Sequence, residues 1–150
     1  YGLPAAIGAR FAASDDQKVV CIDGDGSFLM TLQELSVAVR EELDITVVVL
    51  NNAGIGMVRQ WQDAFYGHRR MASEYPWVPD FSKIADAFGA KGFLLENVED
   101  VESIIREAIE YKGPSVIDAR IDPAENVFPM VPSGGANGLF ALTEEHLEEL

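Results

Sequence analysis

Two short polar segments carry the residue types that could bind a charged ligand. Residues 24–27 (Gly-Asp-Gly-Ser) follow the apolar run 19–23, and residues 51–54 (Asn-Asn-Ala-Gly) follow the apolar run 45–50. Glycines let backbone N–H groups approach an anion closely. Carboxylate and amide oxygens are the hard ligands that Mg²⁺ requires. The two segments together predict a site for Mg²⁺ and a diphosphate group.

The elements that would position these segments follow from the pattern of apolar residues. Four short runs, 19–23, 45–50, 92–95 and 115–119, are predicted as strands, and amphipathic stretches separate them. This alternation favours βαβ units, so the predicted fold class is α/β, a parallel β-sheet with helices on both faces. Ligands of such sheets bind at the carboxyl ends of strands, which is where both polar segments lie.

Helix boundaries are also indicated by residue type. Thr31 followed by Glu34 is typical of a capping box, so a helix is expected to begin near Thr31 with its positive end towards the first polar segment. Asp80 is expected to begin a second helix that ends at Gly89, and Asn97 to begin a third.

Residues 1–125 are predicted to form one α/β domain, and residues 126–150 an arm and a terminal helix of that domain. Proline and glycine are frequent in the arm at 128–138. The final helix is expected to expose its acidic residues to solvent: Glu144, Glu145, Glu148 and Glu149. Because the chain starts at Tyr1 within a segment typical of a domain interior, we expect it to be part of a longer protein.

Composition limits the possible partners. Apolar residues make up 48% and charged residues 24%, as in ordinary globular domains. The net charge of −14 argues against nucleic acid, whose phosphates require clustered Lys and Arg. No apolar run predicts a membrane span or a secretion signal. The single cysteine, Cys21, is expected to be a buried thiol in a reducing compartment, either the cytoplasm or a plastid stroma.

Other ligand-binding motifs fit the first polar segment less well. A Rossmann fingerprint requires glycine where Leu29 stands, and the chain contains no P-loop pattern. Phe28 occupies the position at which an EF-hand loop requires glycine, although that loop is matched by Asp23, Asp25, Ser27, Thr31 and Glu34. Zinc is not expected from one cysteine and the separated His68 and His146. From these residues alone, a turn without any ligand stays open as an alternative.

Several separated motifs resemble one family. The pattern of residues 24–26 (Gly-Asp-Gly) and 51–52 (Asn-Asn), with residues 27–50 between them, resembles the signature of thiamine-diphosphate enzymes. Residues 1–8 (YGLPAAIG), 56–62 (GMVRQWQ) and 128–132 (FPMVP) are similar to acetolactate (acetohydroxyacid) synthase large subunits. The resemblance runs over nearly all of residues 1–140 and corresponds to the last of that family's three domains.

The resemblance implies a role for individual residues. Asp25, Asn52 and the backbone carbonyl of Gly54 would bind Mg²⁺. The implied cofactor-binding residues are Gly24, Asp25, Gly26, Ser27, Asn52, Gly54, Gly56 and Met57. Asn51 is expected only to close its turn. Residues 53–55 (Ala-Gly-Ile) replace more polar residues of the family, so side-chain hydrogen bonds are not expected there.

Met57, Trp61 and Phe65 share one helical face by their spacing. The pattern alone is typical of a core stripe. The resemblance implies instead that this stretch borders the substrate channel, and that Trp61 helps to select the second 2-ketoacid.

The activity implied by the resemblance is condensation of pyruvate with a second 2-ketoacid (pyruvate or 2-ketobutyrate), with loss of CO₂, in branched-chain amino acid biosynthesis. It uses thiamine diphosphate and Mg²⁺, with FAD in the full-length enzyme. The activating glutamate would come from another domain of a second identical subunit, so the fragment alone is expected to be inactive. A regulatory small subunit is a further candidate partner. Alternatives are another thiamine-diphosphate carboligase, decarboxylase or oxidase, or a non-catalytic cofactor-binding or assembly module.

Overall fold

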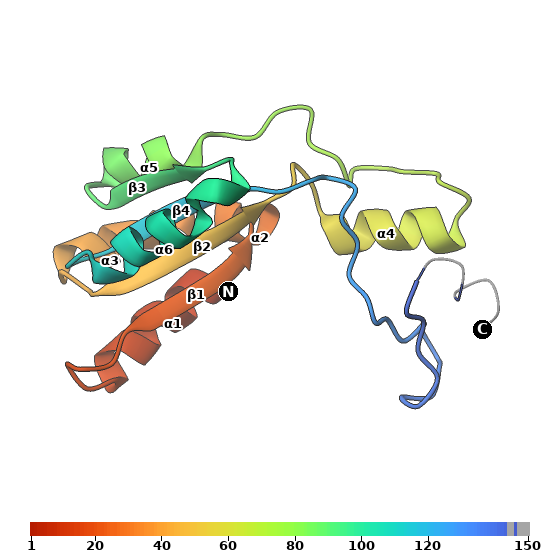
Figure 1. The fold of residues 1–150 in the computed structure, drawn as a ribbon, viewed down its shortest axis with the longest axis horizontal. Helices are drawn as coiled ribbons and strands as arrows, with labels where there is room; N and C mark the ends of the chain where they lie inside the picture. Colours follow the sequence, from red (N-terminus) through yellow and green to blue (C-terminus); the bar gives the residue numbers. More distant parts are fainter. Residues whose placement is uncertain (144–145, 147–150) are drawn as a thin grey trace.

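The computed structural model describes residues 1–143 and 146, and its centre is a sheet of four parallel strands (Figure 1). The order across the sheet is β1-β2-β4-β3. The strands are β1 (Val19–Gly24), β2 (Ile45–Asn51), β3 (Lys91–Leu95) and β4 (Ser115–Arg120). All predicted strands are confirmed, with bounds that differ by a single residue. β-Branched residues dominate β2, and nearly all residues of β4 are buried, as expected for central strands covered on both faces.

Helices cover both faces of the sheet, which confirms the predicted fold class. Neighbouring residues of a strand point to opposite faces, so Val116 and Ile117 of β4 lie in two different cores. The core around Val116 includes α1 (Gly2–Ala12), α2 (Asp25–Thr31), α3 (Leu35–Arg40) and α5 (Phe81–Phe88). The core around Ile117 includes α6 (Val101–Glu110).

One part of the sheet is not covered by any helix of the described residues. β1 is an edge strand, and Cys21 points into the larger core as a buried free thiol, as predicted. Val20 and Ile22 must then point to the opposite face, where Ile22 is 69% exposed. Leu50 of β2 is also exposed. No helix in the described part of the chain is long and apolar enough to cross a membrane.

Of the predicted helix starts, Asp80 is confirmed and Thr31 is wrong, while Asn97 precedes a 3₁₀ turn that continues into the expected helix. The Asp80 side chain accepts a hydrogen bond from the Lys83 N–H at 3.1 Å, and α5 ends at Gly89, whose φ is +90°. The Thr31 capping box does not form. Instead Asp25 begins α2 directly after β1, Thr31 is the last residue of α2, and a 3₁₀ turn (Leu32–Glu34) follows.

The physical reason for the error at Thr31 is local. Gly24 has the extended backbone of an N-cap, and an acidic residue is favourable in the first helical turn. These features of the polar segment start the helix earlier than the Thr31 pattern predicts. At the third predicted start, Asn97 is the N-cap of a 3₁₀ turn and donates to the Asp100 side chain at 3.1 Å. The 3₁₀ turn Val98–Asp100 therefore precedes α6, which begins at Val101.

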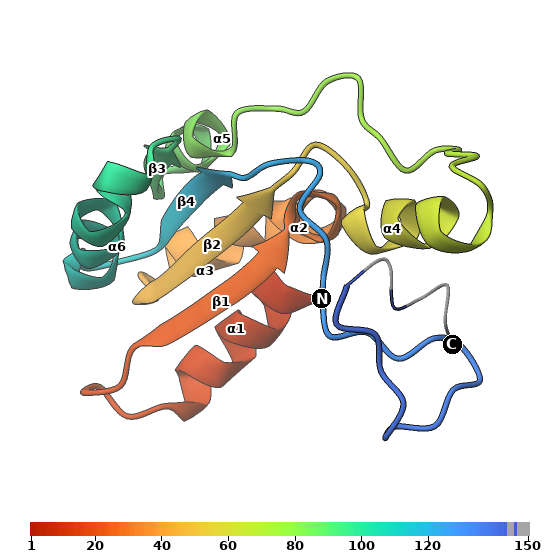
Figure 2. The ribbon, with the colours of Figure 1, turned by 45° about the vertical axis from the view of Figure 1, so that its right-hand side comes forward.

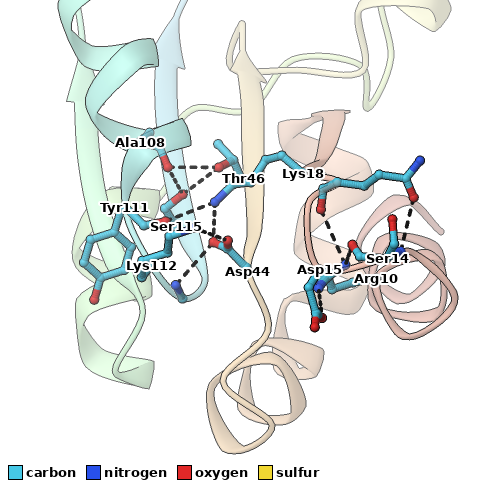
Figure 3. Close-up of polar contacts among 12 residues, drawn as sticks. Arg10, Ser14, Asp15, Lys18, Asp44, Thr46, Ala108, Tyr111, Lys112 and Ser115 are labelled. Atoms are coloured by element: carbon cyan, nitrogen blue, oxygen red, sulfur yellow. Dashed lines mark hydrogen bonds and ion pairs between the residues drawn. The ribbon is translucent and has the colours of Figure 1, made fainter.

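Charged side chains join the segments that enter the amino ends of the strands (Figure 3). The Asp44 carboxylate accepts hydrogen bonds from Lys18, from Lys112 at 3.3 Å and from the Gly113 N–H at 3.4 Å. Lys18 also donates to the Tyr111 carbonyl at 3.0 Å. Burial alone would raise the pKa of Asp44, but the hydrogen bonds and charges of the two lysines hold it below its usual value.

A buried neutral network lies at the same end of the sheet (Figure 3). The Thr46 and Ser115 hydroxyls both donate to the Ala108 carbonyl at 3.0 Å, and Ser115 lies 3.0 Å from the Thr46 oxygen. This network attaches the end of α6 to β2 and β4 without any charge.

At the opposite end, α4 (Gly56–Phe65) and the arm after β4 lie on the same side of the molecule, beyond the carboxyl ends of the strands (Figures 1 and 2). An isolated bridge between Met130 and Ala141 folds the arm back on itself. The predicted division at residue 125 stays a prediction, and the terminal acidic helix lies outside the described residues.

Candidate functional site

A cavity of about 480 Å³ opens at the carboxyl ends of β1 and β2. All the residues predicted to bind the cofactor line it: Gly24, Asp25, Gly26, Ser27, Asn52, Gly54, Gly56 and Met57. Met30, Leu50 and Ile55 add an apolar wall, and Gln60 and residues within 121–127 form the rest. The structure therefore brings the predicted set into one place, while the role of each residue in binding stays a prediction.

Asp25 connects the two polar turns. Its Oδ1 accepts the Gly26 N–H at 2.6 Å and its Oδ2 accepts the Gly54 N–H at 3.2 Å. The side chain is 1% exposed, and among the described residues no Lys or Arg forms an ion pair with it. Burial raises the pKa of Asp25 above its usual value, against the lowering effect of these N–H groups. A buried carboxylate without a cation has spare acceptor capacity for one.

The second turn is held in an unusual backbone conformation. Ala53 has φ +54°, a region that L-residues other than glycine seldom adopt. Asn51 closes the turn as predicted, because its Oδ1 accepts the Ala53 N–H at 3.3 Å. A returning segment pairs alongside, with Ile55 donating to the Ser73 carbonyl and Tyr75 to the Ala53 carbonyl, both at 2.8 Å.

Two glycines of the site allow this close packing. A Cβ at Gly54 would lie 2.5 Å from the carbonyl oxygen of Ser73, which is backbone and cannot move aside easily. A Cβ at Gly26 would lie 2.7 Å from the Tyr75 hydroxyl oxygen. The sequence analysis missed Ser73 and Tyr75, because their contact with the turn arises only when the segment after α4 folds back.

Helix α4 exposes Met57 and Phe65 and leaves Trp61 half-buried, so the predicted substrate-channel residues differ in their access to solvent. Trp61 and Phe65 stack edge to face with ring centroids 5.9 Å apart, whereas only Met57 of the predicted trio lines the cavity. Met57 and Phe65 are exposed, and the buried side chains of α4 are instead Arg59 and Gln60. The apolar stripe of α4 is therefore not part of the core in this structure.

Gln60 attaches the arm to the site. Its Nε2 donates to the Val127 carbonyl at 3.0 Å, and its Oε1 accepts the Val127 N–H at 3.1 Å. The segment between β4 and the arm, together with the start of the arm, forms one wall of the cavity through Ile121, Glu125, Asn126 and Val127. Sequence analysis did not find this contact, since no local pattern connects a helix residue with a backbone far along the chain.

The geometry therefore combines a buried carboxylate, an amide side chain and closely packed glycine turns around one cavity, which is a site suited to a metal-bound anion. Residues 1–119 match the family described as thiamine pyrophosphate enzyme, C-terminal TPP binding domain.

Relatives of known name share this region. The chain is 46% identical over 138 residues to the acetolactate synthase large subunit of Pyropia yezoensis, covering 91% of this chain and 23% of that protein. It is 43% identical over 137 residues to the acetolactate synthase isozyme 1 large subunit of Escherichia coli, covering 91% of this chain and 24% of that protein. It is also 43% identical over 134 residues to the mitochondrial acetolactate synthase catalytic subunit of Saccharomyces cerevisiae, covering 89% of this chain and 19% of that protein.

Solved structures of related enzymes share the fold. The thiamine diphosphate-dependent 4-hydroxybenzoylformate decarboxylase of Rhodococcus jostii matches with a TM-score of 0.74 and 28% identity, over 81% of this chain and 23% of that one. Benzoylformate decarboxylase of Polynucleobacter necessarius matches with a TM-score of 0.75 and 26% identity, over 83% of this chain and 24% of that one. This chain spans about a quarter of the length of most of these relatives. On the match over residues 1–119, the chain belongs to the family of C-terminal TPP-binding domains of thiamine pyrophosphate enzymes.

Proposed function

We propose that this chain is the thiamine-diphosphate-binding domain of an acetolactate synthase, which condenses pyruvate with a second 2-ketoacid with loss of CO₂. The observation that carries the proposal is the buried Asp25 carboxylate, which joins the two polar turns at the mouth of one cavity. Similarity to named acetolactate synthases over 91% of the chain supports this choice within the family.

The donor set at the cavity fits Mg²⁺ with a diphosphate. Asp25, the Asn52 side-chain oxygen and the Gly54 carbonyl would supply hard oxygen ligands, and diphosphate oxygens would complete the octahedron. The cation would also neutralise the buried carboxylate, which has no cationic partner among the described residues. Gly24, Gly26 and Ser27 would contact the diphosphate through the first turn of α2.

The remaining residues of the site would orient substrates and exclude water. Bound thiamine diphosphate supplies the carbanion chemistry, and the protein positions it. Met57 would contact the cofactor and, with Trp61 and Phe65, border the path of the 2-ketoacids. Gln60 would hold the arm as a cavity wall against solvent. FAD would be bound largely by another domain of the full-length enzyme.

The proposal extends to partners and location. The activating carboxylate would come from another domain of a second identical subunit, and the name "large subunit" carried by relatives supports a small regulatory subunit as an additional partner. The buried free Cys21 supports a reducing compartment, either cytoplasm or plastid stroma.

Acetolactate formation from pyruvate by the full-length protein tests the activity. We expect turnover that requires both Mg²⁺ and thiamine diphosphate, and none from purified residues 1–150, because general base catalysis needs a carboxylate within hydrogen-bond reach of the cofactor. Release of acetaldehyde without acetolactate would favour a decarboxylase instead. Turnover by residues 1–150 alone would contradict the division of the active site between domains.

A further inference from the structure

A second buried carboxylate lies behind the cavity and was not among the predicted site residues. Asp118 of β4 is 0% exposed and accepts three hydrogen bonds. Its Oδ1 accepts from Asn51 Nδ2 at 2.9 Å. Its Oδ2 accepts from the Phe81 N–H at 3.0 Å and from Arg120 Nη2 at 2.8 Å. Asp118 therefore joins the end of β2 to the start of α5.

Asn51 transmits this attachment to the turn of the site. While its Nδ2 donates to Asp118, its Oδ1 accepts the Ala53 N–H at 3.3 Å. On the other side of the same turn, Asp25 accepts the Gly54 N–H at 3.2 Å. Two buried carboxylates thus hold one turn, Asp25 directly and Asp118 through Asn51.

The residue between these contacts needs such support. The left-handed φ of Ala53, +54°, is unfavourable for an L-residue and persists only where surrounding contacts hold it. The conformation of Ala53 sets the relative directions of the Asn52 side chain before it and the Gly54 carbonyl after it. These are the two ligands that the proposed metal site takes from this turn.

We infer that Asp118, acting through Asn51, is a positioning residue for the metal ligands of the turn 51–54. The inference rests on the proposed function. Mg²⁺ tolerates little departure from octahedral geometry, so a turn that loses this support presents its two ligands poorly. Loss of comparable outer contacts typically weakens metal affinity by about 10- to 100-fold.

The test is Mn²⁺ binding by the full-length protein in the presence of thiamine diphosphate, followed by the electron paramagnetic resonance of free and bound Mn²⁺. Asp118→Asn places an amide N–H opposite the side-chain N–H of Asn51, so the two donors repel each other. Asn51→Ala removes the side chain that links Asp118 to the turn. Each should weaken Mn²⁺ binding by about 10-fold or more. The reversed pair, Asn51→Asp with Asp118→Asn, can form all the same hydrogen bonds with donor and acceptor exchanged, and should restore affinity to within about 3-fold of the wild type.

Thr46→Ala is the matched control, because it removes a buried hydroxyl from the opposite end of the same strand. It should lower the melting temperature and leave Mn²⁺ affinity unchanged. Unchanged affinity in Asp118→Asn and Asn51→Ala, equal loss in Thr46→Ala, or no recovery in the reversed pair would each overturn the inference alone. If Asp118→Asn does not fold, Asn51→Ala and the reversed pair decide. Absence of Mn²⁺ binding in the wild type would overturn the proposed metal site as well.

Discussion

Two carboxylates, one near each end of the sheet, lie in opposite electrostatic environments. At the amino end, Asp44 is paired with Lys18 and Lys112, and its pKa lies below the usual value. At the carboxyl end, Asp25 is buried without a cation among the described residues, and its pKa lies above the usual value. The first environment satisfies the charge within the fold, whereas the second leaves it to be satisfied by a ligand.

This difference separates stability from function within one small domain. A paired, partly buried charge adds modestly to the free energy of unfolding. A buried charge without a partner opposes folding, so its presence is explained by what it binds. Substitutions at the two ends should therefore affect different measurements.

The largest effect is expected at the unpaired carboxylate. Asp25→Ala removes the only carboxylate among the proposed metal ligands, so we expect Mg²⁺-dependent affinity for thiamine diphosphate to fall by more than about 100-fold. Calorimetry on the full-length protein measures this, with circular dichroism to verify folding. Undiminished cofactor affinity would contradict the metal assignment and remove the distinction between the two ends.

A smaller effect is expected at α4, which lies beyond the same end of the sheet. Trp61→Leu should leave cofactor affinity unchanged and alter the choice between pyruvate and 2-ketobutyrate as acceptor. An apolar wall distinguishes one methylene by about 1–3 kcal/mol. Competition between the two acceptors gives the product ratio. An unchanged ratio together with a lower melting temperature would show that Trp61 serves packing alone.

At the amino end the effect should appear in stability only. Asp44→Asn removes the charge that Lys18 and Lys112 share, so the free energy of unfolding should fall by about 1 kcal/mol. Urea denaturation measures this change, and cofactor affinity should match the wild type. Weaker cofactor binding in this variant would show that the two ends are energetically coupled.

The pH dependence should have opposite signs at the two carboxylates, and this is the smallest effect. Because the folded pKa of Asp44 is lowered, its contribution to stability is present above its ordinary value of 3.8 and is lost as the pH falls through the folded value. Because the folded pKa of Asp25 is raised, its contribution is present below 3.8 and is lost as the pH rises through the folded value.

Urea denaturation of the cofactor-free protein across this pH range, compared with Asp44→Asn and Asp25→Asn, isolates the two contributions. The stability difference between the wild type and Asp44→Asn should shrink towards low pH. As the pH rises above 3.8, the free energy of unfolding of the wild type should fall relative to that of Asp25→Asn. Shifts of the same sign would show that the two environments are electrostatically alike.

Local patterns predicted most of the fold. The β-branched runs gave the strands to within a residue, and Asp80 gave the start of α5. The helix start predicted at Thr31 was wrong because Gly24 and Asp25, which were identified as site residues, also begin a helix. The predicted cofactor residues share a cavity because the carboxyl ends of adjacent parallel strands lie at one edge of a sheet.

Long-range contacts of the site were not predictable in this way. Asp118 and Asn51 meet because β2 and β4 are neighbours in the sheet, an order that residue patterns do not determine. Likewise, the contact of Ser73 with Gly54 joins residues that are distant in sequence. Such contacts hold the turn, and only the folded chain reveals them.

The attachment of the arm through Gln60 has a consequence for how this cavity can diversify. Gln60 recognises the N–H and the carbonyl of Val127, which every residue except proline provides. The side chain at 127, which lines the cavity, is therefore free to change while the wall stays in place. Single substitutions at 127 can therefore change the lining of the cavity while Gln60 still binds the backbone there.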